Sequence, residues 1–571
     1  MSQFPRDQLH LHMQHLADQV LPHIREDGAN IWGLDQHPDV AKHPSTFFQN
    51  VHQYYLYLAT RDDIPDAKRD AYRHAGLANM AFSVTRVDDQ ARLEIWQSGH
   101  HNLGAVRDEW HAYALLLSLE IVERDGLHCS AHGDITTYLK TYGEQDVAWI
   151  RGLAEHPTTR QFCSNHFMWR LTLVHRLGRY FDRQDWCDLA NTIYWDEVLP
   201  AQTPDGCWNE FGYPTSKYHH IHASAIGSHW LLEQDHPGER AAVEGALDFC
   251  RKWSYPDATA IETIDGRVVH QPHVQPMFCP AFVHWPEGQA YLAESLASHA
   301  ATPSLASVEG PGHLTWLGFF ANALPTTLPV LDTPAIPLPS VVELRSHQAL
   351  RVDRGKWTLA ACGFSRPFST ARFCKDFQNH LSLFHREHGL LVGGGHSKRD
   401  PWLSTFAQTA GGSAYLAQAC QTLSMDDDTL RLVLDYGEHQ LEAQVRLIDD
   451  THVDFTGIWL TPRADCEWEF GITIPSPAGT TWLFDDEPII PLDTSHRVNK
   501  LKRPGQGDIV GIHAGLTQVS LADSGNVRWP TLSYEPGGSY PHATIHGAVS
   551  RVSVPLTPRR PQQCIHLTLV S

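Results

Sequence analysis

The chain lacks several features that would place it in a membrane or a disulfide-rich class. No apolar run approaches the roughly 20 residues of a membrane span, and no apolar segment follows a basic N-terminal stretch, as a secretion signal requires. Its eleven cysteines are scattered from Cys129 to Cys564 without a CxxC pair. An odd, dispersed set favours reduced, buried thiols over a disulfide framework. We therefore expect a cytoplasmic protein.

Positive charge is also scarce. The chain has 44 Lys and Arg against 65 Asp and Glu, which gives a formal net charge of −21. Binding to nucleic acid or to an anionic membrane needs a basic surface, so the charge argues against both partners. A local basic pocket for a small acidic substrate remains compatible, because net charge is an average over the whole molecule. Composition leaves homo-oligomer formation open.

The first part of the chain has the pattern of a helical domain. At 571 residues the chain is too long for one ordinary core, so two or three domains are expected. Apolar residues recur at three- and four-residue spacing up to about residue 320, which predicts ten to twelve antiparallel helices in a bundle, a solenoid or a closed double ring. The expected helices cover residues 8–25, 46–60, 66–83, 106–124, 132–152, 159–182, 184–199, 217–234, 238–254 and 286–299.

The second part has the pattern of a β domain. Residues 300–340 contain seven prolines, which break long helices and indicate a linker. From about Ser340 the apolar residues alternate with polar ones, and turn residues separate the runs. This pattern predicts a large antiparallel β-sandwich. The fold class is therefore multidomain, α followed by β.

Two polar clusters stand out in the helical part. The first is the run from Asp205 to His222, in which an Asp-Gly turn and an acidic, aromatic loop lead into a helix that Ser216 can cap. Its candidate side chains are Trp208, Glu210, Tyr218, His219 and His222. The second cluster, Asn165-His166, lies on an otherwise apolar helix. Carboxylate, phenol and imidazole groups at a junction of loop and helix are typical of acid–base sites.

Three further segments add candidates. The Gly- and His-rich stretch 97–111 offers His101 and Arg107, the loop after residue 264 offers His270, and the glycine-rich run Gly393–Asp400 offers His396. That run lacks the GxxxxGK[ST] spacing of a phosphate-binding loop. The chain also has 18 Trp, which can stack on sugar rings. Each of these candidates also has a structural interpretation without function. The tryptophans and histidines would then belong to the core, the histidines being hydrogen-bonded there, and the glycine-rich run would be a solvated turn.

The order of the domains, with Asn165-His166 on one helix and Tyr218-His219 opening another after an Asp-Gly turn, resembles the polysaccharide lyases that combine an (α/α) toroid with an antiparallel β-sandwich. The heparinase II/III-like and oligoalginate lyases look nearest. The resemblance implies a toroid over 1–325, a linker over 326–345 and a β-sandwich over 346–571. It requires no cofactor. It leaves room for a structural divalent metal in the β domain, for which no ligand spacing here is decisive.

The resemblance also implies a reaction. β-Elimination next to a uronic acid needs a neutralised carboxylate, a base for the C5 proton and an acid for the leaving oxygen. Asn165 and His166 would meet the carboxylate, with His166 also a candidate base. Tyr218 and His219 would supply acid–base groups, and an arginine such as Arg107 or Arg170 would hold the acidic sugar. The expected substrate contacts are His101, Arg107, Trp208, Glu210, His222, His270 and His396.

Two other functions stay open. A toroid glycoside hydrolase would use paired carboxylates, for which Asp205, Glu210, Asp108 and Glu109 are available. Asp108 and Glu109 could equally be favourable charge at a helix N-terminus. A non-catalytic carbohydrate-binding protein would use its aromatic side chains without turnover. The preferred interpretation is a lyase acting on small, acidic oligosaccharides from the chain end.

Overall fold

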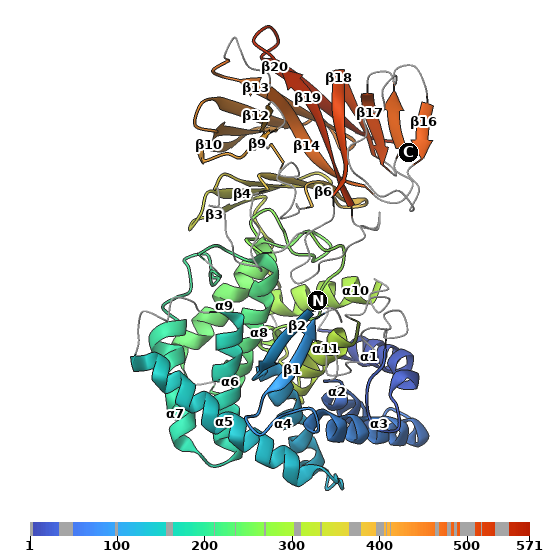
Figure 1. Cartoon of the computed structure of the whole chain (residues 1–571), viewed down its shortest axis with the longest axis vertical. Helices are drawn as coiled ribbons and strands as arrows, with labels where there is room; N and C mark the ends of the chain where they lie inside the picture. The colour runs from blue at the N-terminus through green and yellow to red at the C-terminus, as the bar shows by residue number, and fades with distance from the viewer. Residues whose placement is uncertain are drawn as a thin grey trace. The chain divides into compact units, whose positions relative to one another are not determined.

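The structure is a computed structural model of the 571-residue chain. It describes residues 4–32, 50–97, 101–155, 164–210, 212–233, 236–267, 270–301, 310–331, 334–364, 379–394, 405–406, 408–410, 413–462, 468–476, 481–484, 488–491, 509–514, 517–531 and 548–570. Helices dominate the first of these ranges and strands the last (Figure 1). The expected order, helices followed by antiparallel sheets, is confirmed.

The chain divides into two compact units. The first comprises residues 1–212, 218–251 and 273–337, and the second comprises residues 213–217, 252–272 and 338–571. The second unit thus includes two short segments from the middle of the chain. The linker expected over 326–345 stays a prediction. Among the described residues, no helix combines the length and apolar character needed to span a membrane.

The helices lie close to the positions that the apolar periodicity predicts. They are α1 (Arg6–Val20), α2 (His52–Ala59), α3 (Asp66–Val84), α4 (Glu109–Arg124), α5 (His132–Glu155), α6 (Asn165–Tyr180), α7 (Gln184–Ile193), α8 (Ser216–Leu232), α9 (Pro237–Lys252), α10 (Pro286–Ala301) and α11 (Gly310–Ala323). Short 3-10 turns cover Leu21–His23 and Pro280–His284, and a π-helical turn, Tyr194–Val198, extends α7. An unexpected antiparallel hairpin, β1 (Leu93–Gln97) and β2 (His101–Val106), precedes α4.

Helix α4 lies at the centre of the contacts that position the site. It packs against α2, α5, α6 and α11, and Figure 1 shows α4, α5 and α6 side by side. The expected stripe of Trp110, Ala114, Leu117 and Ile121 is buried. Burial of each of the larger side chains, such as Leu117 and Ile121, contributes roughly 1.5–3 kcal/mol to stability. The first turns of α4 and α6 are thereby held next to each other.

The turn at Gly206 lies against the backbone of α9. Gly206 has φ +89°, and a Cβ atom built on it would lie 2.1 Å from the carbonyl oxygen of Gly245. Only glycine combines this conformation with so close a backbone approach. The turn therefore fixes where the following loop, which carries Glu210, begins.

The second unit contains two larger sheets with antiparallel pairing throughout the described strands. One has the order β3-β4-β5-β6-β7, and the other follows β10-β11-β12-β13-β20-β18-β17-β15-β16, with β19 joining β18 to β14. Both sheets contribute to one hydrophobic core, from Leu350 and Leu383 in the first to Phe455 and Ile565 in the second. A shared core between two antiparallel sheets is the packing expected of a sandwich.

The strands of the five-stranded sheet are β3 (Val341–Leu344), β4 (Ala349–Arg354), β5 (Trp357–Cys362), β6 (Leu381–His385) and β7 (Gly389–Val392). The remaining strands are β8 (Gln408–Ala410), β9 (Ser413–Tyr415), β10 (Ala419–Asp426), β11 (Thr429–Asp435), β12 (Gln440–Leu447), β13 (His452–Trp459), β14 (Trp468–Ser476), β15 (Thr481–Phe484), β16 (Pro488–Pro491), β17 (Ile509–Ala514), β18 (Thr517–Thr531), β19 (Ala548–Leu556) and β20 (Gln562–Leu569). β8 and β9 pair only with each other.

Candidate functional site

The candidate site is built on the N-terminal ends of α4 and α6. Asp108 caps α4 by accepting a hydrogen bond from the backbone N–H of His111 at 2.9 Å. Ser164 caps α6 by accepting one from the N–H of Phe167 at 3.2 Å. Both residues are good N-cap formers because a short side-chain oxygen can reach the free N–H groups of the first turn. The caps fix the positions of Glu109 and His166, which follow them in the sequence.

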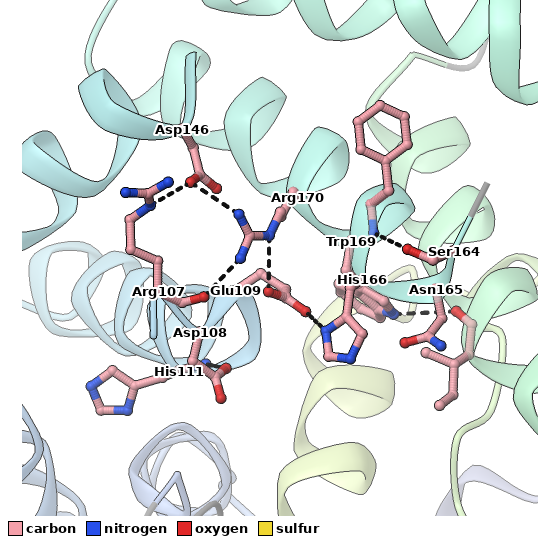
Figure 2. A network of polar contacts seen from close by, with 12 residues as sticks. Arg107, Asp108, Glu109, His111, Asp146, Ser164, Asn165, His166, Trp169 and Arg170 are labelled. Carbon is pink, nitrogen blue, oxygen red and sulfur yellow. Dashed lines mark hydrogen bonds and ion pairs between the residues drawn. The ribbon is translucent and has the colours of Figure 1, made fainter. Parts of the chain in front are cut away.

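Glu109 connects α4 to α6. Its Oε1 accepts a hydrogen bond from Nδ1 of His166, and its Oε2 lies 3.3 Å from Nε of Arg170. Arg170 also reaches Asp146 at 3.4 Å, and Arg107 contacts the same Asp146 oxygen at 2.9 Å. These five residues form the Glu109 network, and Figure 2 shows Glu109 lying between Arg170 and His166. The network joins residues from β2–α4, α5 and α6.

His166 is the most exposed member of the network. Its side chain is 57% exposed, whereas that of Glu109 is 2% exposed and that of Asp146 is fully buried. The ring of Trp110 lies 4.7 Å from the His166 ring, centroid to centroid. The group presented to a ligand is therefore an imidazole that an indole and a buried carboxylate hold in place.

The network determines the protonation of its members. Desolvation works against protonation of His166, but the Glu109 carboxylate outweighs it and raises the pKa of the imidazole. Desolvation likewise opposes ionisation of Glu109, but His166 and Arg170 lower its pKa. Burial, with the neighbouring Glu109 charge, raises the pKa of Asp108 to about 6. The contact thus favours the imidazolium form of His166 and the ionised form of Glu109.

A second carboxylate, Glu210, connects the start of α6 to α8. One of its oxygens accepts hydrogen bonds from the backbone N–H of Asn165, at 3.2 Å, and from the Asn165 side-chain amide. The same oxygen lies 3.7 Å from Nε2 of His222. Asn165 and His222 are fully buried, and Glu210 is 2% exposed. We call these three residues the Glu210 bridge; it satisfies a free N–H of the first turn of α6.

Tyr218 lies on the same helix as His222, one turn earlier. Residues four apart on a helix share a face, with Cβ atoms about 5–6 Å from each other. His222 lies 3.7 Å from Glu210 at the start of α6, so Tyr218 shares the helix face that meets Glu210. The Tyr218 side chain is partly exposed, so it is accessible to a ligand.

Other residues predicted from the run 205–222 lie in the interior. His219 is fully buried, its Nε2 lies 3.2 Å from the carbonyl oxygen of Ala246, and burial lowers its pKa well below the usual value. Trp208 is fully buried, and its Nε1 donates to the carbonyl oxygen of Val198 at 2.8 Å. The geometry is that of core residues, so neither the catalytic role predicted for His219 nor sugar stacking on Trp208 gains support.

The predicted substrate contacts outside this run lie in different places. Arg107 and Arg170 are already bound to carboxylates of the Glu109 network. His270 belongs to the second unit, where its Nδ1 lies 3.8 Å from Oε2 of Glu262 and burial lowers its pKa. His101 begins β2, but its side chain lies outside the described part of the chain, as does all of His396. The structure therefore brings together Arg107, Asn165, His166, Glu210 and His222.

The sequence interpretation missed the role of Glu109. It was considered for a hydrolase pair, for the lining of the cleft and for favourable charge at a helix end, and the helix-end position is correct. Its contact with His166 spans 57 residues. The available signal was a carboxylate as the first residue of one helix and a histidine as the second residue of another.

Comparison with solved structures supports the fold. The crystal structure of heparinase III superposes with a TM-score of 0.52 at 9% identity, covering 91% of this chain and 76% of that chain. A mutant of the heparan sulfate lyase HepC from Pedobacter heparinus gives a TM-score of 0.48 at 10% identity, covering 98% and 83% of the two chains. No protein-family model and no curated protein sequence matches the chain. The likeness to heparinase III therefore shows that the two chains share a fold.

Proposed function

We propose that the chain is a lyase that cleaves uronic-acid-containing oligosaccharides by β-elimination, with its helical part forming an (α/α) toroid. The observation that supports this most directly is the exposed His166 held protonated by the buried Glu109. A cation backed by a buried carboxylate is suited to a ligand carboxylate, and it is poorly suited to removing a proton. The heparinase III fold is consistent with the same chemistry.

In this proposal His166 neutralises the uronate. Its Nδ1–H is engaged by Glu109, so Nε2–H is the donor that faces the substrate carboxylate. Binding the carboxylate makes the C5 proton more acidic, because the enolate-like charge that develops on proton removal meets a positioned cation. This assigns His166 to charge neutralisation; the base role also considered for it disagrees with its raised pKa.

Tyr218 then carries the proton chemistry. A base removes the C5 proton, the electrons form the C4–C5 double bond, the bond from C4 to the glycosidic oxygen breaks, and an acid protonates that oxygen. Tyr218 can serve as both groups in turn, since the C5 proton taken by the phenolate is the one returned to the leaving oxygen. Its position one turn before His222 supports this role.

In this proposal Asn165 supports the first turn of α6 and does not contact the substrate. Its amide and backbone N–H bind Glu210, and its side chain is fully buried. We propose that the Glu210 bridge holds the first turn of α6 so that His166 points to the substrate. Contact between Asn165 and the uronate would require the side chain to become accessible on binding.

The carboxylates favour elimination over hydrolysis. A glycosidase needs two carboxyl groups that face the substrate from opposite sides of the bond. Of the four carboxylates considered for hydrolysis, Asp108, Glu109 and Glu210 are at most 5% exposed, and each binds a neighbouring helix end, histidine or arginine. The fourth, Asp205, is partly exposed, which leaves one accessible carboxyl group of this set where hydrolysis needs two. Their role in this structure is to orient other groups.

The test is a screen of uronate-containing oligosaccharides followed by ultraviolet absorbance and mass spectrometry. Elimination yields a conjugated, unsaturated uronate with new absorbance, whereas hydrolysis yields reducing ends without it. His166→Ala and Tyr218→Phe should each lower the rate at least 100-fold while the chain stays folded. Undiminished cleavage in both variants would contradict the assigned site, and binding without any cleavage would identify a carbohydrate-binding protein.

A further inference from the structure

A carboxylate, a thiol and an imidazole lie side by side on one face of the second unit's larger sheet. Strands β13 and β20 pair with Asp454 opposite His566, and Cys564 lies two residues before His566 on the same strand. Burial alternates along β13, with Val453 and Phe455 in the core and Asp454 between them only partly buried. Because side chains alternate across a strand, Asp454, Cys564 and His566 all point away from the core.

The three ligand atoms are already close enough to share one ion. Oδ1 of Asp454 lies 2.5 Å from Nδ1 of His566, and Sγ of Cys564 lies 3.8 Å from the same nitrogen. All three atoms lie within 4.8 Å of one another. With metal bonds of about 2.0–2.3 Å, tetrahedral geometry places an O,N pair about 3.3 Å apart and an S,N pair about 3.6 Å apart. To reach this geometry, the ligand atoms of Asp454 and His566 need to move apart by less than about 1 Å.

We propose that Asp454, Cys564 and His566 form a binding site for Zn²⁺, with water in the fourth position. Thiolate, imidazole and carboxylate together are ligands of zinc, whereas Mg²⁺ and Ca²⁺ take oxygen ligands. The side chains of Asp454 and His566 are 34% and 44% exposed, so an ion can reach them from solvent.

The surroundings suit such a site. The hydroxyl of Thr456, opposite Cys564 on β13, donates to the sulfur at 3.6 Å and orients it. Arg446, opposite Asp454 on β12, is paired at 3.5 Å with Asp428. Zinc would displace the thiol proton to solvent on binding.

The site would join two strands that are far apart in the sequence. Asp454 and His566 are 112 residues apart, so one ion would cross-link β13 to the last strand of the chain. An ion that binds the folded state alone stabilises that state in proportion to the logarithm of its concentration over the Kd. The expected role is therefore to hold β20 in the sheet, and it does not depend on the proposed lyase reaction.

The experiment is a Zn²⁺ titration of the full chain after treatment with a chelator, followed by calorimetry and by competition with a chromophoric zinc indicator. Wild type should bind one equivalent that excess Mg²⁺ does not displace. Cys564→Ser and Asp454→Asn should each weaken that site at least tenfold, with circular dichroism confirming the fold. Cys420→Ser is the matched control, because Cys420 is a partly buried thiol on β10 outside the cluster.

Co²⁺ provides a second measurement that reports on the sulfur ligand. The cobalt form of wild type and of Cys420→Ser should show thiolate-to-metal charge-transfer absorbance, which Cys564→Ser should lack. The inference is overturned if wild type binds no stoichiometric zinc, or if Cys564→Ser binds it with wild-type affinity. Neither result bears on the lyase proposal, since the readout is metal binding in the second unit.

Discussion

Glu109, the first residue of α4, accepts a hydrogen bond from Nδ1 of His166, the second residue of α6. The contact joins two helix N-termini, where the backbone dipole favours negative charge and disfavours positive charge. Glu109 is therefore favoured at its own helix end and compensates for the unfavourable position of the imidazolium. A single carboxylate thus determines both the orientation and the charge of the exposed histidine.

Replacement of Glu109 by Gln should remove this effect. Without the carboxylate the pKa of His166 falls, and the fraction of imidazolium at neutral pH falls with it. In the lyase proposal kcat/KM should drop about 100-fold, and the basic limb of its pH profile should move to lower pH. NMR titration of His166 measures the pKa directly, and Glu244→Gln is the control because Glu244 pairs with Arg240 at the surface. An unchanged pH profile would exclude the positioning role.

The raised pKa of His166 also makes the stability of the fold depend on pH. The folded-state pKa of His166 is raised above its unfolded value of about 6.5, so its protonation stabilises the fold fully below that pH. The contribution disappears as the pH rises through the folded-state pKa. Glu109→Gln should therefore lose more stability relative to wild type at pH 6 than at pH 9, which urea denaturation at the two pH values checks.

Asp108 should show the same direction of pH dependence, because its folded-state pKa is also raised. Its folded-state pKa of about 6 exceeds its unfolded value of about 3.9, so the free energy of unfolding falls as the pH rises between these values. The shift corresponds to about 2–3 kcal/mol. Asp108→Asn keeps the cap acceptor and removes the titration. Its Tm relative to wild type should therefore rise from pH 4 to pH 7, with Asp125→Asn, at the exposed end of α4, as the control.

Removal of Glu210 should destabilise the helical unit. Glu210→Ala leaves the backbone N–H and the amide of the buried Asn165 without their acceptor, at a cost of about 3 kcal/mol. Glu210→Gln keeps an acceptor in place and should cost less. The midpoint of urea denaturation measures both, with Asp196→Ala on the exposed side of the π-helical turn as the control. Equal stability of wild type and Glu210→Ala would show that the bridge contributes nothing.

Trp208 should behave as a core residue. Trp208→Phe keeps most of the buried ring but removes the donor to the carbonyl of Val198, so it should cost about 1–3 kcal/mol of stability. Its affinity for oligosaccharides should stay at the wild-type value. Trp149→Ala is the contrasting variant, because the Trp149 side chain is 38% exposed and stacks under Arg170 at 4.9 Å. Lower sugar affinity in Trp208→Phe at unchanged stability would contradict the core assignment.

The sequence predicted the helical part well because its signal is local. Helices such as 66–84 and 184–193 follow from apolar spacing within a few turns. The spacing placed the start of the helix over 159–182 too early, because α6 begins at Asn165, after the Ser164 cap. The hairpin of β1 and β2 was not predicted, because it is short and leads directly into α4. Local patterns determine where elements begin and end, and that is the information the sequence carries most directly.

Partnerships between distant residues could not be predicted in the same way. Asn165 and His166 were recognised as a polar pair, but which carboxylate binds each depends on how α4, α6 and the loop before α8 pack. Glu210 was taken for a substrate contact, although it is buried as an acceptor for Asn165. Likewise, Asp454 meets His566 only because β20 pairs with β13. These contacts arise from tertiary packing, which periodicity does not report.

The contact between Gly206 and α9 has a consequence for which sequences can encode this protein. Any side chain at position 206 would collide with the carbonyl oxygen of Gly245 and would also adopt an unfavourable φ. A library randomised at position 206 and selected for folding should return glycine alone, whereas position 245, where an added Cβ has 3.2 Å to its nearest neighbour, should also accept alanine. Although the two glycines are in contact, only position 245 is expected to tolerate a substitution.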